Sequence, residues 1–174
     1  MGRYYQTILR GLINMTSYNF INLEDFVDML LEERHRTFIV HSEPMSGKSK
    51  YAKRFAKKIE GKYLDLLEQF REDRNLKNSI DTFSIKELEI LLVEEAKDTS
   101  LLIVDNIEFL LNTWGEDRYD LLFRLINEKW NSFYSSYEAT LGIFLISNCK
   151  IMNMKLKTNK DKSRIFHLQE LESL

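Results

Sequence analysis

The sequence predicts an α/β protein in which a parallel sheet of about five strands is covered by helices on both faces. Short apolar segments alternate with longer amphipathic segments along the chain, and this alternation favours parallel strands joined by right-handed helical crossovers. The apolar run Leu101–Val104 is continuous and not alternating, as expected for a strand that is covered on both faces. We therefore expect three layers, α/β/α, with a helical N-terminus.

Caps and periodicities place the individual elements. Asn22, followed by acidic residues, is typical of a helix start, and the capping-box spacing from Ser84 to Glu87 indicates another. The predicted helices run to about residue 35 and over 48–60, 84–97 and 116–133, and the predicted strands are Thr37–His41, Tyr63–Leu67, Leu101–Val104, Leu141–Ser147 and Arg164–Leu168.

Length and composition restrict the class of protein. A chain of 174 residues is long enough for one domain, in which we expect a helical extension at 1–35 and a core at 36–168. Hydrophobic residues make up 44% and charged residues 30%, and the net charge of −2 excludes a general attraction to nucleic acid. The single cysteine, Cys149, excludes a disulfide within the chain and fits a reducing compartment.

The chain also lacks the sequence features of membrane insertion and secretion. No apolar run approaches the roughly 20 residues that span a bilayer. Residues 1–5 show no signal-peptide pattern. We expect a cytoplasmic protein without membrane contact.

The most informative motif lies between the first predicted strand and the helix after it. Residues Ser42–Ser49 read S-E-P-M-S-G-K-S, one glycine short of the phosphate-binding pattern G-x-x-x-x-G-K-[ST], in the strand–loop–helix context that this pattern needs. Gly47 would let the backbone wrap closely around phosphates, Lys48 would reach the β- and γ-phosphates, and the Ser49 hydroxyl would ligate Mg²⁺. The predicted nucleotide-binding residues are Ser42, Glu43, Pro44, Met45, Ser46, Gly47, Lys48, Ser49 and Lys50.

Ser42 departs from the pattern, which has glycine at this position. A serine adopts positive φ at a greater cost than glycine, so we expect a strained or slightly reshaped loop. The alternative interpretation is an ordinary strand–loop–helix unit with an accidental G-K-S.

A second part of the site follows the third predicted strand. The run Leu101–Val104 ends in Asp105, which would present its carboxylate at the carboxyl edge of the sheet, where ligands of open α/β sheets bind. Asp105 can hold the Mg²⁺ shared with Ser49, usually through water. The alternative is an acid that caps the turn after a buried strand. Asp65, near the end of the second predicted strand, is either a substrate-binding acid of kinase type or part of a turn.

Three segments together resemble an AAA+-type P-loop ATPase of the ASCE class. They are S-E-P-M-S-G-K-S as Walker A, L-L-I-V-D-N as Walker B, and the later L-G-I-F-L-I-S-N as the sensor strand. In that family the Walker B strand comes after an inserted strand, and a polar residue ends the sensor strand, here Ser147-Asn148. The resemblance covers Thr37–Leu168, and the size of the chain is similar to that of the small P-loop protein of BREX phage-defence systems, the BrxF type.

The resemblance implies a P-loop NTPase core that binds ATP and Mg²⁺. It implies catalytic roles for Lys48, Asp105 and Asn148, with Ser49 and Asp105 as the metal-binding residues. It also implies an arginine finger near the start of the last strand, where Arg164 matches the position loosely.

Three departures from the family weaken the expectation of hydrolysis. Asn106 stands where the family has the glutamate base and cannot accept a proton, and Glu108 is either a substitute base or a surface acid. Met45 replaces a second glycine of many loops of this family. Little sequence follows Leu168, so we expect no C-terminal lid domain.

Arg164 also belongs to the most basic segment of the chain. Three interpretations compete for this segment: an arginine finger in an oligomer, a nucleic-acid contact and a solvated loop. Its basic residues are Lys150, Lys155, Lys157, Lys160, Lys162 and Arg164.

The leading hypothesis is an ATP-binding regulatory or assembly subunit of a larger complex, of BREX phage-defence type, with weak or partner-dependent hydrolysis. Its partners would be copies of itself, other defence proteins, or both. The first alternative is a small-molecule or nucleoside kinase, although no arginine-rich lid insertion is visible. The second alternative is a non-hydrolysing scaffold with a degenerate loop. The substitutions at Ser42, Met45 and Asn106 favour this alternative.

Overall fold

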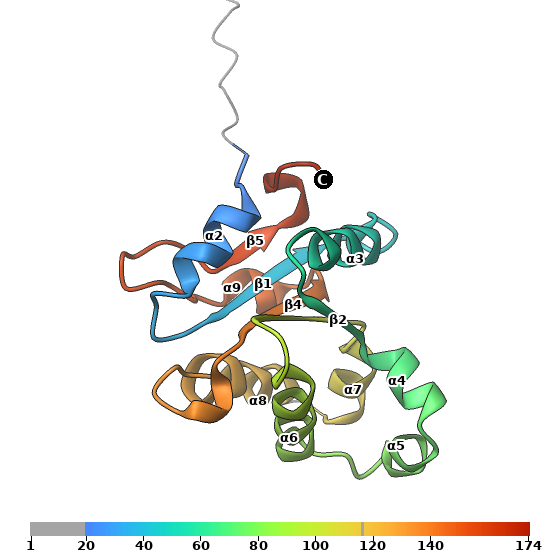
Figure 1. The fold of residues 1–174 in the computed structure, drawn as a ribbon. Coiled ribbons are helices and arrows are strands. Elements are labelled where there is room, and N and C mark those ends of the chain that lie inside the picture. The colour runs from blue at the N-terminus through green and yellow to red at the C-terminus, as the bar shows by residue number, and fades with distance from the viewer. Residues whose placement is uncertain (1–19, 116) are drawn as a thin grey trace, which may run out of the picture.

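The computed structural model describes residues 20–115 and 117–174, and its centre is a parallel sheet. Within these residues the sheet has five strands, in the spatial order β2-β3-β4-β1-β5, and every pair of neighbours is parallel (Figure 1). The predicted α/β class, the strand number and the strand direction are therefore confirmed. The strands are β1 (Thr37–Ser42), β2 (Lys62–Asp65), β3 (Leu101–Asp105), β4 (Thr140–Ile146) and β5 (Ile165–His167).

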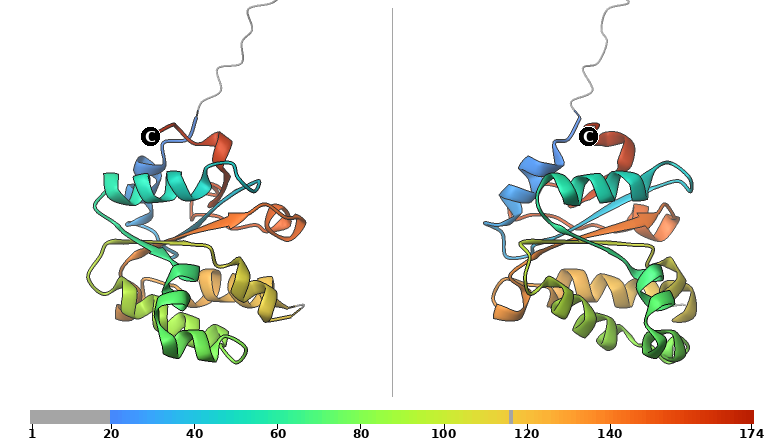
Figure 2. Two further views of the ribbon diagram at one scale, coloured as in Figure 1. Left: turned by 90° about the vertical axis from the view of Figure 1, so that its right-hand side faces the viewer. Right: turned by 45° about the vertical axis from the view of Figure 1, so that its right-hand side comes forward.

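Helices cover both faces of the sheet, as Figures 1 and 2 show. One face carries α2 (Leu23–Leu30) and α3 (Lys48–Lys58). The other face carries α4 (Leu66–Glu72), α5 (Arg74–Ser79), α6 (Ile85–Ala96), α7 (Glu108–Thr113) and α8 (Arg118–Arg124), which continues as the π-helical turn η1 (Leu125–Lys129). Shorter connecting elements are η2 (Ser135–Tyr137), α9 (Cys149–Asn153) and η3 (Leu168–Glu170).

Side-chain alternation along the strands divides the apolar core into two parts. In β1, Phe38 and Val40 pack toward α2 and α3, whereas Ile39 packs toward the larger helical layer. All six residues of β1 are buried, which explains why its centre, Phe38-Ile39-Val40, is apolar without alternation. None of the described helices is long and apolar enough to cross a membrane.

The predicted helix caps are present. The side chain of Asn22 accepts hydrogen bonds from the backbone N–H groups of Glu24 (3.0 Å) and Asp25 (3.1 Å) at the start of α2. Ser84 and Glu87 form the reciprocal capping box of α6. The predicted N-terminal helical extension is represented by α2, and residues 1–19 lie outside the described part of the chain.

Several predicted boundaries are wrong for local reasons. The second strand ends at Asp65 and not at Leu67, because Asp65 accepts a hydrogen bond from the Glu68 N–H (3.1 Å) and starts α4. The predicted helix 116–133 ends at Lys129, because Trp130 turns inward and donates its indole N–H to the Ala139 carbonyl (2.9 Å). Its first residue, Glu116, lies outside the described residues. The short helices α7 and α9 span too few turns to show a helical period in the sequence.

Gly142 in β4 makes room for the ring of Phe38. A Cβ atom at Gly142 would lie 2.8 Å from Cδ1 of Ile103 and 2.9 Å from Cε1 of Phe38, closer than packed carbon atoms approach. We therefore expect Gly142→Ala to lower the free energy of unfolding by about 1–3 kcal/mol, measured by chemical denaturation. In a Phe38→Leu background the same change should cost less, because the smaller side chain vacates part of the space. Equal costs in both backgrounds would contradict this packing account.

Candidate functional site

The carboxyl ends of the five strands lie at one edge of the sheet, and a hollow opens there. The chain leaves β1 toward α3 on one face, whereas it leaves β3 and β4 toward helices on the other face. Ligands of open α/β sheets bind where neighbouring connections diverge in this way. The hollow has a volume of about 510 Å³ and is lined by Glu43, Pro44, Met45, Gly47, Lys48, Ser49, Lys50, Asn106 and Ile146.

The segment Ser42–Ser49, here named the 42–49 loop, has its unusual backbone at Met45 and Gly47. Their φ angles are 63° and 90°, in the left-handed region that favours glycine. Ser42 is the buried last residue of β1, is not among the residues with positive φ, and its Oγ accepts a hydrogen bond from the Ser46 hydroxyl (2.7 Å). The expectation of strain at Ser42 is therefore wrong, and the fully exposed Met45 adopts the left-handed conformation instead.

Helix α3 begins at the hollow without the cap that other helices of this length have. Its N-cap residue, Gly47, makes no side-chain hydrogen bond, and its first turn contains no acidic residue. By contrast, Asn22 caps α2 and Ser84 caps α6. The positive end of the α3 dipole therefore faces the hollow, which Lys48 and Lys50 also line, an arrangement that an anion would stabilise.

Asp105 lies beneath the loop, at the end of β3, and none of its surface is exposed. Its Oδ1 contacts the ammonium group of Lys48 and accepts a hydrogen bond from the Asn106 N–H (2.9 Å). Its Oδ2 accepts a hydrogen bond from the hydroxyl of Tyr63 (3.0 Å). The structure thus brings Lys48 and Asp105 together as a direct ion pair. No open space separates the two side chains.

Tyr63 is a part of this cluster that the sequence analysis missed. In the β2–β3 register Tyr63 is paired with Ile103 and Asp65 with Asp105, so alternate side chains of both strands face α3. Burial, followed by the negative charge of Asp105, raises the pKa of Tyr63, so the phenol stays a protonated donor. The signal that could have found Tyr63 is its spacing of two residues from Asp65, which places both on one face of a strand.

Asn106 is held by Asp65. The backbone of Asn106 has a φ of 57°, which asparagine tolerates better than most residues, and its Nδ2 donates a hydrogen bond to Oδ2 of Asp65 (2.9 Å). The other carboxylate oxygen of Asp65 caps α4. Asn106 is the residue at the end of β3 that lines the hollow.

Glu108 and Asn148 hold backbone segments at the rim of the sheet. Oε1 of Glu108 accepts a hydrogen bond from the Ile146 N–H (2.7 Å). Asn148 accepts from the Ile151 N–H (3.0 Å), which caps α9, and donates to the hydroxyl of Tyr119 (2.8 Å). Neither Glu108 nor Asn148 is among the described residues that line the hollow. Their catalytic roles therefore stay predictions.

Two histidines connect the 42–49 loop with β4 and β5. Nε2 of His167 donates to a carboxylate oxygen of Glu43 (3.0 Å), while Nδ1 of His41 is hydrogen bonded to the Ser147 hydroxyl (2.9 Å). Nδ1 of His167 accepts from the Gln169 N–H, which places the proton of the neutral ring on Nε2. Burial, followed by the charge of His167, lowers the pKa of His41. These contacts fix the start of the loop.

The predicted metal ligands are hard oxygen donors, which suit Mg²⁺. Mg²⁺ usually binds one or two protein oxygens and completes its shell with water and phosphate, so a Ser49 hydroxyl and an Asp105 carboxylate fit its chemistry. Both oxygens of Asp105 already accept hydrogen bonds, so Asp105 would act through water or after Lys48 moves. Within residues 20–115 and 117–174, no cluster of three or more His, Cys, Asp or Glu residues is arranged to hold a metal.

The expectation that Arg164 is an arginine finger is wrong. Its side chain is 1% exposed, and it lies at the start of β5, at the opposite edge of the sheet from the 42–49 loop. The guanidinium donates to the carbonyl groups of Thr37 (3.1 Å) and Lys157 (3.1 Å) and to Oδ1 of Asn127 (2.9 Å). Burial lowers the pKa of Arg164 to about 10, so it is still charged at neutral pH. A finger needs a guanidinium that is free to reach the nucleotide phosphates, in its own subunit or in a neighbouring one.

The rest of the basic segment is partly neutralised. Lys157 forms an ion pair with Asp161 (2.6 Å), which leaves four exposed lysines for the predicted nucleic-acid contact. These are Lys150, Lys155, Lys160 and Lys162.

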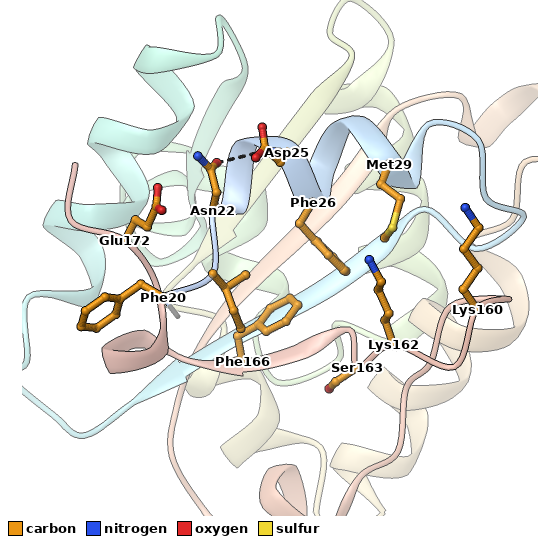
Figure 3. A pocket seen from close by; sticks show the side chains of 11 residues that line it. Phe20, Asn22, Asp25, Phe26, Met29, Lys160, Lys162, Ser163, Phe166 and Glu172 are labelled. Carbon is orange, nitrogen blue, oxygen red and sulfur yellow. Dashed lines mark hydrogen bonds between the residues drawn. The ribbon is translucent and has the colours of Figure 1, made fainter. Parts of the chain in front are cut away.

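A second hollow of about 800 Å³ lies between α2, β5 and the C-terminal segment (Figure 3). Phe26 and Phe166 form its apolar centre, and Lys160 and Lys162 stand at one side. No residue of the 42–49 loop lines this hollow. It contains acids and lysines, but the helix start that borders it, that of α2, is capped by Asn22, so we place the candidate site at the loop, where the start of α3 is uncapped.

No protein-family model matches the chain, and no curated protein matches it significantly.

Replacing Arg164 should affect stability. Arg164→Ala removes hydrogen bonds to several buried groups, so we expect the free energy of unfolding to fall by at least about 3 kcal/mol in chemical denaturation. Lys162→Ala, an exposed change two residues away, should stay within about 0.5 kcal/mol of the wild type. If Arg164→Ala were as stable as the wild type, the buried and hydrogen-bonded placement of the Arg164 side chain would be contradicted.

Proposed function

We propose that the chain binds ATP together with Mg²⁺ in the hollow between the 42–49 loop and the end of β3. The observation that carries the proposal is the uncapped N-terminus of α3, which lies at the same hollow as Lys48 and the left-handed residues Met45 and Gly47. Backbone N–H groups in such a turn and a helix dipole both favour a phosphate. The volume of about 510 Å³ is within the range of ligand pockets.

Each residue of the site has a defined part in this proposal. The N–H groups at the start of α3 would donate to phosphate oxygens, and Lys48 would leave Asp105 and contact the terminal phosphates as a point charge. Ser49 and Asp105 would hold Mg²⁺, which neutralises phosphate charge when bound. Gly47 is needed for its φ of 90°, since a Cβ atom there would meet open space.

Hydrolysis is proposed to be slow in the isolated chain. Asn106 uses its Nδ2 on Asp65, which leaves Oδ1 as an acceptor that can orient water but cannot take its proton. Glu108 accepts the Ile146 N–H, so a role as base would cost that hydrogen bond. The role of a nucleotide-dependent regulatory or assembly subunit, of BREX type, follows from the sequence resemblance and belongs to the same proposal.

The second candidate is a scaffold that no longer binds nucleotide. The direct contact between Lys48 and Asp105 favours it, because each charge already has its partner within the chain. The two candidates differ in whether a nucleotide phosphate can take Lys48 from Asp105.

Removing the lysine should separate the two candidates. Lys48→Met alone would leave the buried Asp105 without its cation, a loss worth about 3–5 kcal/mol, so the change is combined with Asp105→Asn. In the absence of metal, the double variant should bind a fluorescent ATP analogue about 10–100-fold more weakly than Asp105→Asn alone, because a charge-assisted contact with phosphate is lost. Lys57→Met, in the last turn of α3, is the matched control and should leave ATP affinity unchanged.

The nucleotide itself supplies a second comparison. Affinity should decrease from ATP to ADP to AMP to adenosine, because the phosphates make the contacts. Folded wild-type protein that binds none of them, with or without Mg²⁺, would contradict the proposed function and favour the scaffold.

A base introduced at Asn106 should accelerate hydrolysis only when Asp65 is neutralised as well. Asn106→Glu alone would place its carboxylate beside Asp65, which now accepts the Asn106 amide at 2.9 Å. In Asp65→Asn/Asn106→Glu the amide and the carboxylate exchange places, and we expect phosphate release to rise about 10²–10⁴-fold over the wild type, the usual worth of a general base. Asp65→Asn alone is the control. Brisk hydrolysis by the wild-type chain would contradict the assignment of Asn106.

A further inference from the structure

Asp105 has three hydrogen-bond donors of unequal mobility. The Asn106 N–H belongs to the backbone next to it, and the Tyr63 hydroxyl is carried by a ring that packs between β2 and α3. The ammonium of Lys48 stands at the end of a flexible side chain, and Lys48 is one of the residues that line the hollow. Only the lysine can leave Asp105 without movement of the sheet.

The departure of Lys48 would leave a buried negative charge. Asp105 has no exposed surface, and Lys48 is the one cation within salt-bridge distance of it in the described part of the chain. A buried carboxylate without a cation is unfavourable, and the cost falls with the number of neutral donors that remain. After the lysine leaves, those donors are the Asn106 N–H and the Tyr63 hydroxyl.

Tyr63 is well placed to remain a donor. The ammonium of Lys53 stands 5.2 Å from the centre of its ring, and the ring belongs to the apolar cluster on the α3 face. Its hydroxyl donates to Oδ2 of Asp105, whereas the ammonium of Lys48 contacts Oδ1. It therefore donates to Asp105 whether or not Lys48 is present.

We propose that Tyr63 is a positioning residue of the phosphate site, which sets how readily Asp105 releases Lys48 to a nucleotide phosphate. This inference rests on the proposed function. Tyr63 touches neither phosphate nor metal in this scheme, and it acts through Asp105. A consequence is that nucleotide and metal bind cooperatively: phosphate takes Lys48, and the uncovered Asp105 then favours a cation in its place.

The inference predicts opposite effects of two substitutions on ATP binding without metal. The measurement is equilibrium binding of a fluorescent ATP analogue in EDTA. Asp105→Asn removes the charge that retains Lys48, so ATP should bind about tenfold more tightly than to the wild type. Tyr63→Phe leaves Asp105 more dependent on Lys48, so ATP should bind several-fold more weakly. With Mg²⁺ present, Asp105→Asn should instead bind ATP more weakly than the wild type, because the metal loses a ligand.

A double-mutant cycle tests whether Tyr63 acts through Asp105. In an Asp105→Asn background, Tyr63→Phe should change the metal-free affinity for ATP by less than about twofold. The reason is that no buried carboxylate is then left for Tyr63 and Lys48 to share. Tyr137→Phe is the matched control: its hydroxyl also donates to a carboxylate, that of Glu89, but in the opposite helical layer. Thermal unfolding of every variant identifies those that do not fold.

The outcomes distinguish this inference from the proposed function. If wild-type protein binds Mg²⁺–ATP but Asp105→Asn binds metal-free ATP no better than the wild type, the inference is wrong and the proposed function stands. An equal loss for Tyr63→Phe with and without Asp105 would also overturn it, since Tyr63 would then act on packing. If wild-type protein binds no nucleotide under either condition, the proposed function has failed first.

Discussion

A buried carboxylate with its cation, Asp105 with Lys48, joins the parts of the molecule that form the candidate site. Asp105 ends β3, Lys48 begins α3, and the hydroxyl of Tyr63 adds β2 to the same contact. A carboxylate with no exposed surface is tolerated only when its charge and lone pairs are satisfied, so this contact holds the start of α3 over the sheet. The 42–49 loop joins β1 to the start of α3, which this contact holds in place. The left-handed backbone at Met45 and Gly47 lets the chain make the turn. The hollow exists because the loop is held in this way.

Under the proposed function, the same contact would separate two states of the site. Without a ligand, Lys48 and Asp105 satisfy each other, and the uncapped N–H groups of α3 are left facing the hollow. A phosphate would take the lysine and the N–H groups together, while a cation would replace the lysine at Asp105. In this exchange neither Lys48 nor Asp105 would be left without a partner of opposite charge. It would also allow a chain with Asn106 in place of a base to respond to nucleotide binding without rapid turnover.

The fold was predictable from the sequence because burial on both faces leaves a strong pattern. The apolar runs of β1 and β3 and the caps at Asn22 and Ser84 identified elements that the structure contains. Element ends were less predictable, since Asp65 caps a short helix that has no detectable period. At the site, the sequence motifs identified the residues of the 42–49 loop and Asp105. Tyr63 was missed because its two-residue spacing from Asp65 indicates only a shared strand face, and the β2–β3 register is needed to bring that face beside Asp105. Arg164 was misassigned because a charged residue in a basic segment resembles a surface residue until its buried partners are known. The positive φ expected at Ser42 occurs at Met45 instead, because Ser42 is still part of strand β1.

The most direct test of the account is a titration of isotope-labelled protein with Mg²⁺–ATP, followed by the backbone amide signals in NMR spectra. The account predicts that the largest saturable shifts occur at the amides of Gly47, Ser49 and Lys50 and of Asn106, which line the hollow at the 42–49 loop. Signals from Phe26 and Phe166, which line the hollow between α2 and β5, should move little. Saturable shifts confined to Phe26 and Phe166, or an unchanged spectrum at millimolar nucleotide, would contradict the claim that the loop and Asp105 form a phosphate site.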